Sequence, residues 1–239
     1  MKRKILRATC IALSAALLFF ALGGTSAEEK ESEIQLIETG EFHGEEVTAE
    51  TGEQWLGLFP AEKGFALLLS TVAIDAVYDP IVDSNESERS GKKVSVIGND
   101  KPIFLLKGAD NLRAGPIATV FSEEKNLGNG ASIDLRLGGK EYQLKVASEN
   151  PEPSEYLAQK PKLLLTRGQT TQVLISLDEH NDAAWTLLWA GDIDGDGDLD
   201  LYLDLSHHYN VSVRTLFLSN GAGKGKLVKE FAAFTTSGC

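Results

Sequence analysis

Aspartate is concentrated in one short stretch, residues 192–200, which holds five carboxylates within nine residues. Side chains so close together repel one another when ionised, and burying them without partners would be costly. A hard divalent cation removes both costs, because Ca²⁺ takes about six to eight oxygen ligands in a flexible shell. We therefore predict a calcium site, with candidate ligands Asp192, Asp194, Asp196, Asp198 and Asp200.

The spacing of this stretch follows the pattern Asp-x-Asp-x-Asp-Gly-x-x-Asp. Its first three aspartates would surround one centre. Gly197 occupies the sixth position, where the loop turns sharply and a left-handed backbone is favourable only for glycine. Asp198 would offer its backbone carbonyl at the seventh position, and Asp200 its side chain or a bridging water at the ninth. The twelfth position is Leu203 rather than glutamate, so the stretch departs from a full EF-hand.

The segments that flank the aspartates are short and apolar, which is typical of strands. Residues 185–190 precede the loop, and residues 201–205, which alternate strictly, follow it. This strand, aspartate loop and strand resembles the calcium loop of FG-GAP/VCBS-type repeats, the kind found in integrin alpha-chain propellers. The resemblance covers roughly residues 185–220. It implies an ion that is mainly structural, with partner binding on other surfaces.

A second acidic stretch, Asp83–Glu88, also contains several oxygen-bearing side chains. It lacks the glycine and the ninth-position acid of the first stretch. We therefore expect no second calcium site there.

Residues 1–27 have the pattern of a Sec-type signal peptide: a basic start, an apolar run and small residues before an acidic segment. We expect cleavage and export to the bacterial periplasm or the medium. No later run is apolar enough to span a membrane, so no transmembrane anchor is expected after cleavage. The cleaved chain keeps only Cys239, which would be a free end or would link two chains as a disulfide-bonded dimer.

The net charge of the chain limits the classes of partner that it is expected to bind. Without the four basic residues of the predicted signal peptide, 19 Lys and Arg face 35 Asp and Glu, a net charge near −16. Such a surface disfavours nucleic acid and anionic lipid. It suits a soluble exported protein in a calcium-containing medium.

The rest of the chain is typical of a mainly β protein. Short β-favouring runs are separated by Gly, Pro and acidic turns, and no long window has helical periodicity. The Gly138–Gly139 step between residues 132–137 and 141–146 predicts a hairpin. Residues 65–69 and 71–78 predict two further strands.

A complete propeller is not expected, because it needs several blades of roughly 40–60 residues and the chain has one aspartate loop. We expect an antiparallel β-sandwich or two small β domains. The predicted order after the signal peptide is an N-terminal β region (28–147), a Pro-rich acidic linker or long loop (148–161), and a C-terminal β region with the calcium loop (162–239).

Asp204, His207 and His208 follow the predicted calcium hairpin. They could supply acid and base groups beside the ion, as in a calcium-dependent hydrolase acting on a polysaccharide-like substrate. No nucleophile motif accompanies them. The favoured interpretation is therefore a non-enzymatic binding module for an unknown protein or glycan ligand.

Two other residue types in the chain could indicate a function. Three tryptophans could form a stacking platform for carbohydrate, but they lie in apolar runs, which favours core packing: Trp55, Trp185 and Trp189. His43 and His180 lie in polar turns and indicate no role.

Overall fold

The computed structural model describes residues 34–98, 101–149, 152–178 and 184–238. In these ranges every regular element is a strand, and all pairing is antiparallel, which confirms the predicted mainly β class. The predicted signal peptide, Cys239 and His180 lie outside the described residues. The strands are β1 (Gln35–Ile37), β2 (Gly40–Phe42), β3 (Gln54–Pro60), β4 (Phe65–Val77), β5 (Gly91–Val96), β6 (Leu105–Lys107), β7 (Gly115–Phe121), β8 (Lys125–Leu127), β9 (Ser132–Leu137), β10 (Lys140–Ala147), β11 (Lys162–Arg167), β12 (Thr170–Ser176), β13 (Trp185–Asp192), β14 (Asp200–Asp204), β15 (Val211–Leu218) and β16 (Lys229–Ser237).

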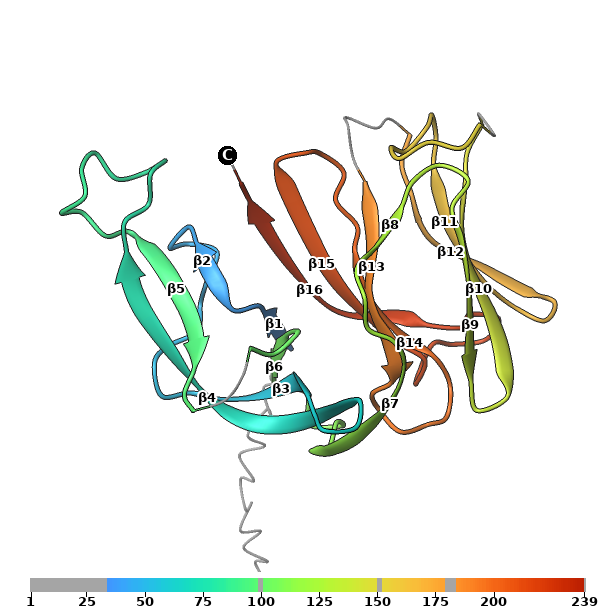
Figure 1. Cartoon of the computed structure of the whole chain (residues 1–239), viewed down its shortest axis with the longest axis horizontal. Helices are drawn as coiled ribbons and strands as arrows, with labels where there is room; N and C mark the ends of the chain where they lie inside the picture. Colours follow the sequence, from blue (N-terminus) through green and yellow to red (C-terminus); the bar gives the residue numbers. More distant parts are fainter. Residues whose placement is uncertain (1–33, 99–100, 150–151, 179–183, 239) are drawn as a thin grey trace, which may run out of the picture. The chain divides into compact units, whose positions relative to one another are not determined.

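The strands form two hydrogen-bonded sheets. Twelve belong to one network, whose main path is β1-β6-β3-β4-β7-β13-β14-β15-β16, with β2, β5 and β8 attached at its sides. The other four form a separate sheet in the order β12-β11-β10-β9 (Figure 1). The predicted hairpin at Gly138–Gly139 is confirmed, with Tyr142 opposite Leu135 and Leu144 opposite Ile133.

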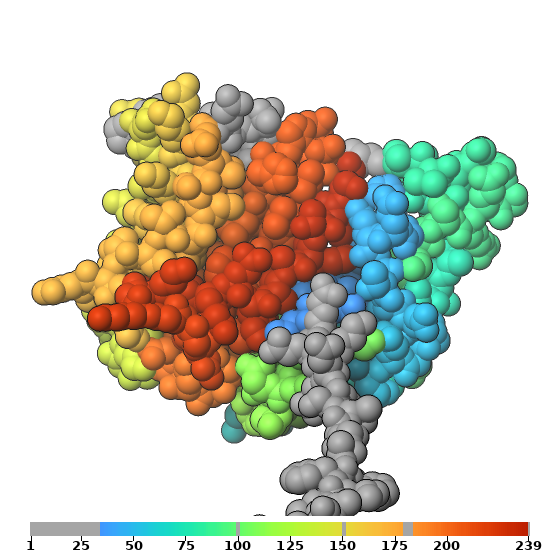
Figure 2. All heavy atoms as spheres, turned by 180° about the vertical axis from the view of Figure 1, so that it is seen from behind, coloured from blue at the N-terminus to red at the C-terminus, as the bar shows by residue number. Residues whose placement is uncertain are grey.

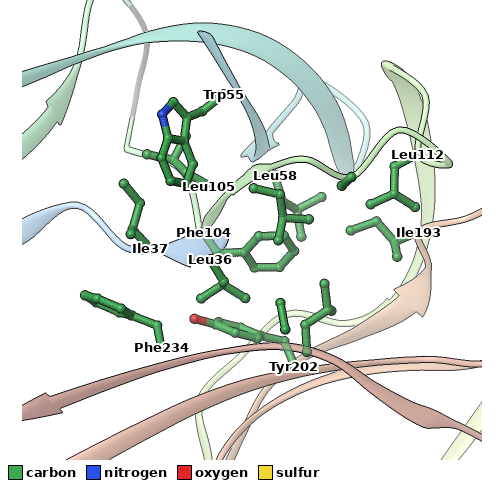
Figure 3. Close-up of a cluster of buried hydrophobic side chains, with 14 of the residues drawn as sticks. Leu36, Ile37, Trp55, Leu58, Phe104, Leu105, Leu112, Ile193, Tyr202 and Phe234 are labelled. Atoms are coloured by element: carbon green, nitrogen blue, oxygen red, sulfur yellow. The ribbon is translucent and has the colours of Figure 1, made fainter. Parts of the chain in front are cut away.

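Two hydrophobic cores lie on opposite sides of strands β13–β16. The first core joins these strands to the N-terminal strands, and Tyr202 packs there against Phe104 with ring centroids 4.7 Å apart (Figure 3). The second core joins them to the four-stranded sheet, through residues such as Leu144 and Leu203. All three tryptophans are fully buried, which confirms their expected place in the core.

Strand β14 lies between the two cores. Leu201 and Leu203 pack into the second core, whereas Tyr202 packs into the first, and all three are fully buried. The alternation seen in the sequence therefore separates two apolar environments rather than core from solvent. Because the aspartate loop leads directly into β14, its conformation bears on both cores.

Strand β4 differs from the prediction of two strands. It runs unbroken from Phe65 to Val77, and its first half pairs with β3 while its second half pairs with β5. The polar Ser70 at the expected break is buried within the strand. The change of partner, rather than a turn, explains the change in sequence pattern.

Residues 148–161 connect β10 and β11, which are adjacent strands of the four-stranded sheet. The described part of this segment is a long loop that packs on the molecule: Leu157 is buried in the second core, and the Ser154 amide donates to the Asn129 carbonyl. Residues 32–239 form one compact unit. Among the described residues, no helix has the length and apolar character needed to cross a membrane.

Candidate metal centre

The aspartate loop, residues 192–200, runs from the last residue of β13 to the first residue of β14 and ends an antiparallel hairpin in which Gly191 pairs with Asp200. Gly195 and Gly197 have φ of +77° and +79°, the left-handed region expected at the sharp turn. The loop's two aliphatic residues point into different cores: Ile193 belongs to the first and Leu199 to the second. Apolar burial at each end thus anchors the loop, with Asp200 fully buried and the other aspartates partly or well exposed.

Backbone amides organise the aspartates. The six consecutive N–H groups of residues 193–198 each donate to an aspartate carboxylate of the loop. Asp192 accepts from the Gly195 amide at 2.8 Å and from the Gly197 amide at 3.0 Å. Asp200 accepts from the Ile193 amide at 2.7 Å. The carboxylates of Asp192 and Asp200 are therefore turned toward the inside of the loop.

Three of the five predicted ligands converge. One carboxylate oxygen from each of Asp192, Asp194 and Asp200 lies within 4.8 Å of the others, a group that could hold a metal ion. Asp194 Oδ2 is buried and has no hydrogen-bond donor. Among the described residues, no Lys or Arg forms an ion pair with any of the three. The arrangement concentrates negative charge without a protein counter-ion.

The electrostatic cost of this arrangement appears in two pKa shifts. Burial raises the pKa of Asp200 to about 7, and the charge of Asp194 adds to the effect, against the hydrogen bonds from Ser219 and Ile193. Burial also raises the pKa of Asp194, with the charges of Asp196 and Asp192 acting in the same direction. A cation among these oxygens would reverse the balance, because it favours the ionised carboxylates.

Asp196 is placed beside the converging group by a residue that sequence reasoning missed. The Ser219 hydroxyl, just after β15, lies 3.0 Å from both carboxylate oxygens of Asp196 and 3.0 Å from Asp200 Oδ1. The Ser219 amide also donates to Asp200 at 2.7 Å. Nothing local in the sequence marks this serine, since its role arises from the pairing of β14 with β15.

The side chain of Asp198 turns away from the other aspartates and contacts the four-stranded sheet. It pairs with Lys140 Nζ at 2.8 Å and with Arg167, and accepts from the Tyr142 hydroxyl at 2.7 Å. Burial alone would raise the pKa of Asp198, but the hydrogen bonds from Lys140 and Tyr142 and the charge of Arg167 outweigh it and lower that pKa. The proposed ligand atom of Asp198, its backbone carbonyl, stays a prediction.

Asp204 ends β14, about 13 Å from Asp200 at the usual rise of an extended strand, and His208 follows in the loop between β14 and β15. Asp204 accepts from the Ser206 and Val213 amides and pairs with Arg214 at 3.3 Å. His208 Nδ1 is 2.5 Å from Asn210 Oδ1. These side chains are engaged locally and are not beside the aspartate loop, and His207, the third residue of the predicted set, belongs to the same end of the hairpin.

Comparison of the chain with protein-family models, with curated proteins and with solved structures found no match. The resemblance to FG-GAP/VCBS-type calcium loops therefore rests on the loop motif alone.

Proposed function

We propose that this protein is an exported calcium-binding β protein in which the ion is bound by the aspartate loop and stabilises the fold. Asp192, Asp194 and Asp200 would supply side-chain oxygens, with Asp196 at the edge of the site. The observation that carries the proposal is Asp194 Oδ2, a buried carboxylate oxygen that accepts no hydrogen bond. Among the described residues, no Lys or Arg pairs with Asp192, Asp194 or Asp200. An ion supplies the missing partner.

The chemistry of the donor set favours calcium. Every side chain that converges is a carboxylate, and hard oxygen donors suit Ca²⁺ or Mg²⁺ rather than metals that prefer nitrogen or sulfur. Mg²⁺ requires near-octahedral geometry and releases its water reluctantly. A loop built on left-handed glycines with many carboxylates suits the larger and more flexible shell of Ca²⁺.

The position of the loop supports a structural role for the ion. Ile193 anchors it in the first core, Leu199 in the second, and Asp200 begins the strand between them. A ligand that binds only the folded loop adds its binding free energy to the stability of that fold. The hydrolase alternative has no comparable support, because Asp204 and His208 are engaged in local hydrogen bonds far from the loop.

Thermal unfolding of the purified protein in Ca²⁺ and in chelator tests the proposal. At calcium concentrations about 100 times the Kd, binding adds about 2.7 kcal/mol, which raises Tm by roughly 5–10 °C for a chain of this size. Asp194→Asn should lose most of that increase. Asp134→Asn, a change at an exposed aspartate on β9, should keep it. Equal Tm values with and without Ca²⁺, together with no heat of calcium binding, would refute the proposal.

A further inference from the structure

A second part of the molecule, unrelated to the aspartate loop, contains a cavity of about 700 Å³. Its walls come from the segment after β2, the end of β4, the loop between β14 and β15, and the end of β16. Two contacts join these walls. Glu46 accepts a hydrogen bond from the Ser237 amide at 2.6 Å, and Phe42 packs edge-on against Phe234 with ring centroids 5.1 Å apart. Figure 2 shows the last strand, in red, against the first described residues, in blue.

His43 is held in this cavity by a buried carboxylate. Its Nδ1 lies 2.6 Å from Asp79, whose side chain is only 3% exposed. Asp79 Oδ1 accepts from the Ile81 amide at 3.0 Å, and the Asp79 amide donates to Asp83 at 2.8 Å. The ring is therefore fixed in place and in tautomer, and Nε2 remains as its available polar atom. This is the arrangement of a group positioned to hydrogen-bond a ligand.

Aromatic faces border the same cavity. Tyr209 is 72% exposed, which is unusual for a large ring, and His208 packs on it at 4.5 Å between ring centroids. Tyr78, which follows β4 and also lines the cavity, is exposed as well. Exposed rings beside polar groups offer an apolar face and a hydrogen-bonding edge to the same ligand.

The charges around the cavity limit the class of ligand. Among the described residues that line it there is no Lys or Arg, and Asp79 already pairs with His43, so an anion would find no free counter-ion there. The four carboxylates among these described residues already have partners: Glu41 with Lys93, Glu46 with Ser237, Asp79 with His43, and Asp204 with Arg214. A cation would therefore have to compete with existing partners. These conditions favour a neutral ligand rich in hydroxyl groups.

We propose that this cavity binds a neutral saccharide, with a sugar face stacked on Tyr209 and a hydroxyl group bonded to His43 Nε2. A pyranose ring presents C–H groups on its faces and hydroxyls at its edge, which matches both features. The proposal does not depend on the calcium site, because the cavity lies at the other end of β14.

Calorimetric titration of the calcium-loaded protein tests this assignment with hexasaccharides of β-1,4-glucose, α-1,4-glucose and β-1,4-N-acetylglucosamine. Spermidine and hexagalacturonate serve as cationic and anionic probes. We expect at least one neutral saccharide to bind. Tyr209→Ala should weaken that binding about tenfold or more. The matched control is Tyr156→Ala, because Tyr156 is also well exposed but lies away from the cavity.

A second readout follows the ring of His43 by NMR while the bound saccharide is added, and its signals should shift. The proposal is overturned if no neutral saccharide binds, if only spermidine or hexagalacturonate binds, or if Tyr209→Ala leaves the affinity unchanged. Repeating the titration in chelator separates this result from the calcium proposal, since saccharide binding can succeed where calcium binding fails.

Discussion

The molecule has two acidic loops in which the pKa values of aspartates shift in opposite directions. In residues 79–90, Asp79 and Asp83 are buried, yet the pKa of each is lowered. In the aspartate loop, Asp194 and Asp200 also lose solvent, but the pKa of each is raised. Burial is the largest influence on the pKa of Asp194 and of Asp200, whereas for Asp79 and Asp83 hydrogen bonds outweigh it.

What differs is the supply of partners. The hydrogen bond from His43 is the largest influence on Asp79, while burial acts in the opposite direction and backbone amides add to the lowering. Asp83 accepts from the Ser90 and Asp79 amides, which outweigh its burial. The aspartate loop also gathers amides, but it assembles more carboxylates than these donors compensate, and one oxygen of Asp194 has no donor. An acidic loop therefore indicates an ion only where its own donors and cations fall short.

The largest effect should come from removing Asp200. Asp200→Ala deprives the Ile193 and Ser219 amides and the Ser219 hydroxyl of a buried acceptor. The Ser219 hydroxyl keeps Asp196 as an acceptor, so the two amides are the groups left unsatisfied. Each costs about 1–3 kcal/mol, so we expect a total loss of about 2–6 kcal/mol. Urea unfolding in chelator measures it, and the Tm increase with Ca²⁺ should vanish.

The matched change in the other loop is Asp83→Ala, which also removes a carboxylate that accepts backbone amides. It should lower stability but leave the response to Ca²⁺ intact. If Asp83→Ala also loses the Tm increase with Ca²⁺, the two loops do not differ in their effect on ion binding.

The next effect is a dependence on pH. Because the folded pKa of Asp200 is raised from 3.8 to about 7, its stabilising contribution is complete below pH 3.8 and is lost as pH rises through about 7. The loss is on the order of 4 kcal/mol in the ion-free protein. Ca²⁺ removes this penalty, so the Tm increase it causes should be larger at pH 8 than at pH 5. An equal increase at the two pH values would contradict the assignment.

A smaller effect is expected at Asp198, which joins the aspartate loop to the four-stranded sheet. Asp198→Ala removes the partner of Lys140, Arg167 and the Tyr142 hydroxyl. These pairs are partly exposed, so the loss should be about 1 kcal/mol, or roughly 2–4 °C in Tm. Calcium binding by calorimetry should weaken far less than in Asp194→Asn. If the two variants lose calcium binding equally, the side chain of Asp198 belongs to the ion site.

The smallest effect concerns His43. Its hydrogen bond to Asp79 is the main cause that raises the pKa of His43 above 6.5. This contribution to stability is complete below pH 6.5 and is lost as pH rises through the folded pKa. NMR titration of the His43 ring should give a value above 6.5, and Asp79→Asn should bring it back toward 6.5. A pKa of about 6.5 for His43 in the unmodified protein would show that Asp79 does not stabilise the protonated ring.

Much of the local structure could be predicted from sequence, because its determinants are local. The spacing of Asp and Gly specified the hairpin from β13 to β14 and the left-handed turn at Gly197, and Gly138–Gly139 specified a second hairpin. Contacts between distant segments were not accessible in this way. Ser219 meets Asp200 only through strand pairing, and His43 meets Asp79 across 36 residues. For the same reason, β4 was predicted as two strands: its pairing partner changes between Thr71 and Val72, but its backbone does not turn.

Strand β14 is buried on both faces, and this has a consequence for how the protein unfolds. Leu201 and Leu203 cannot leave the second core without also withdrawing Tyr202 from the first, because the three are consecutive on one strand. Melting of one core therefore removes a wall of the other, and neither has an independent transition. The N-terminal strands and the four-stranded sheet never touch the same side of β14, yet they are coupled into one cooperative unit through its five residues.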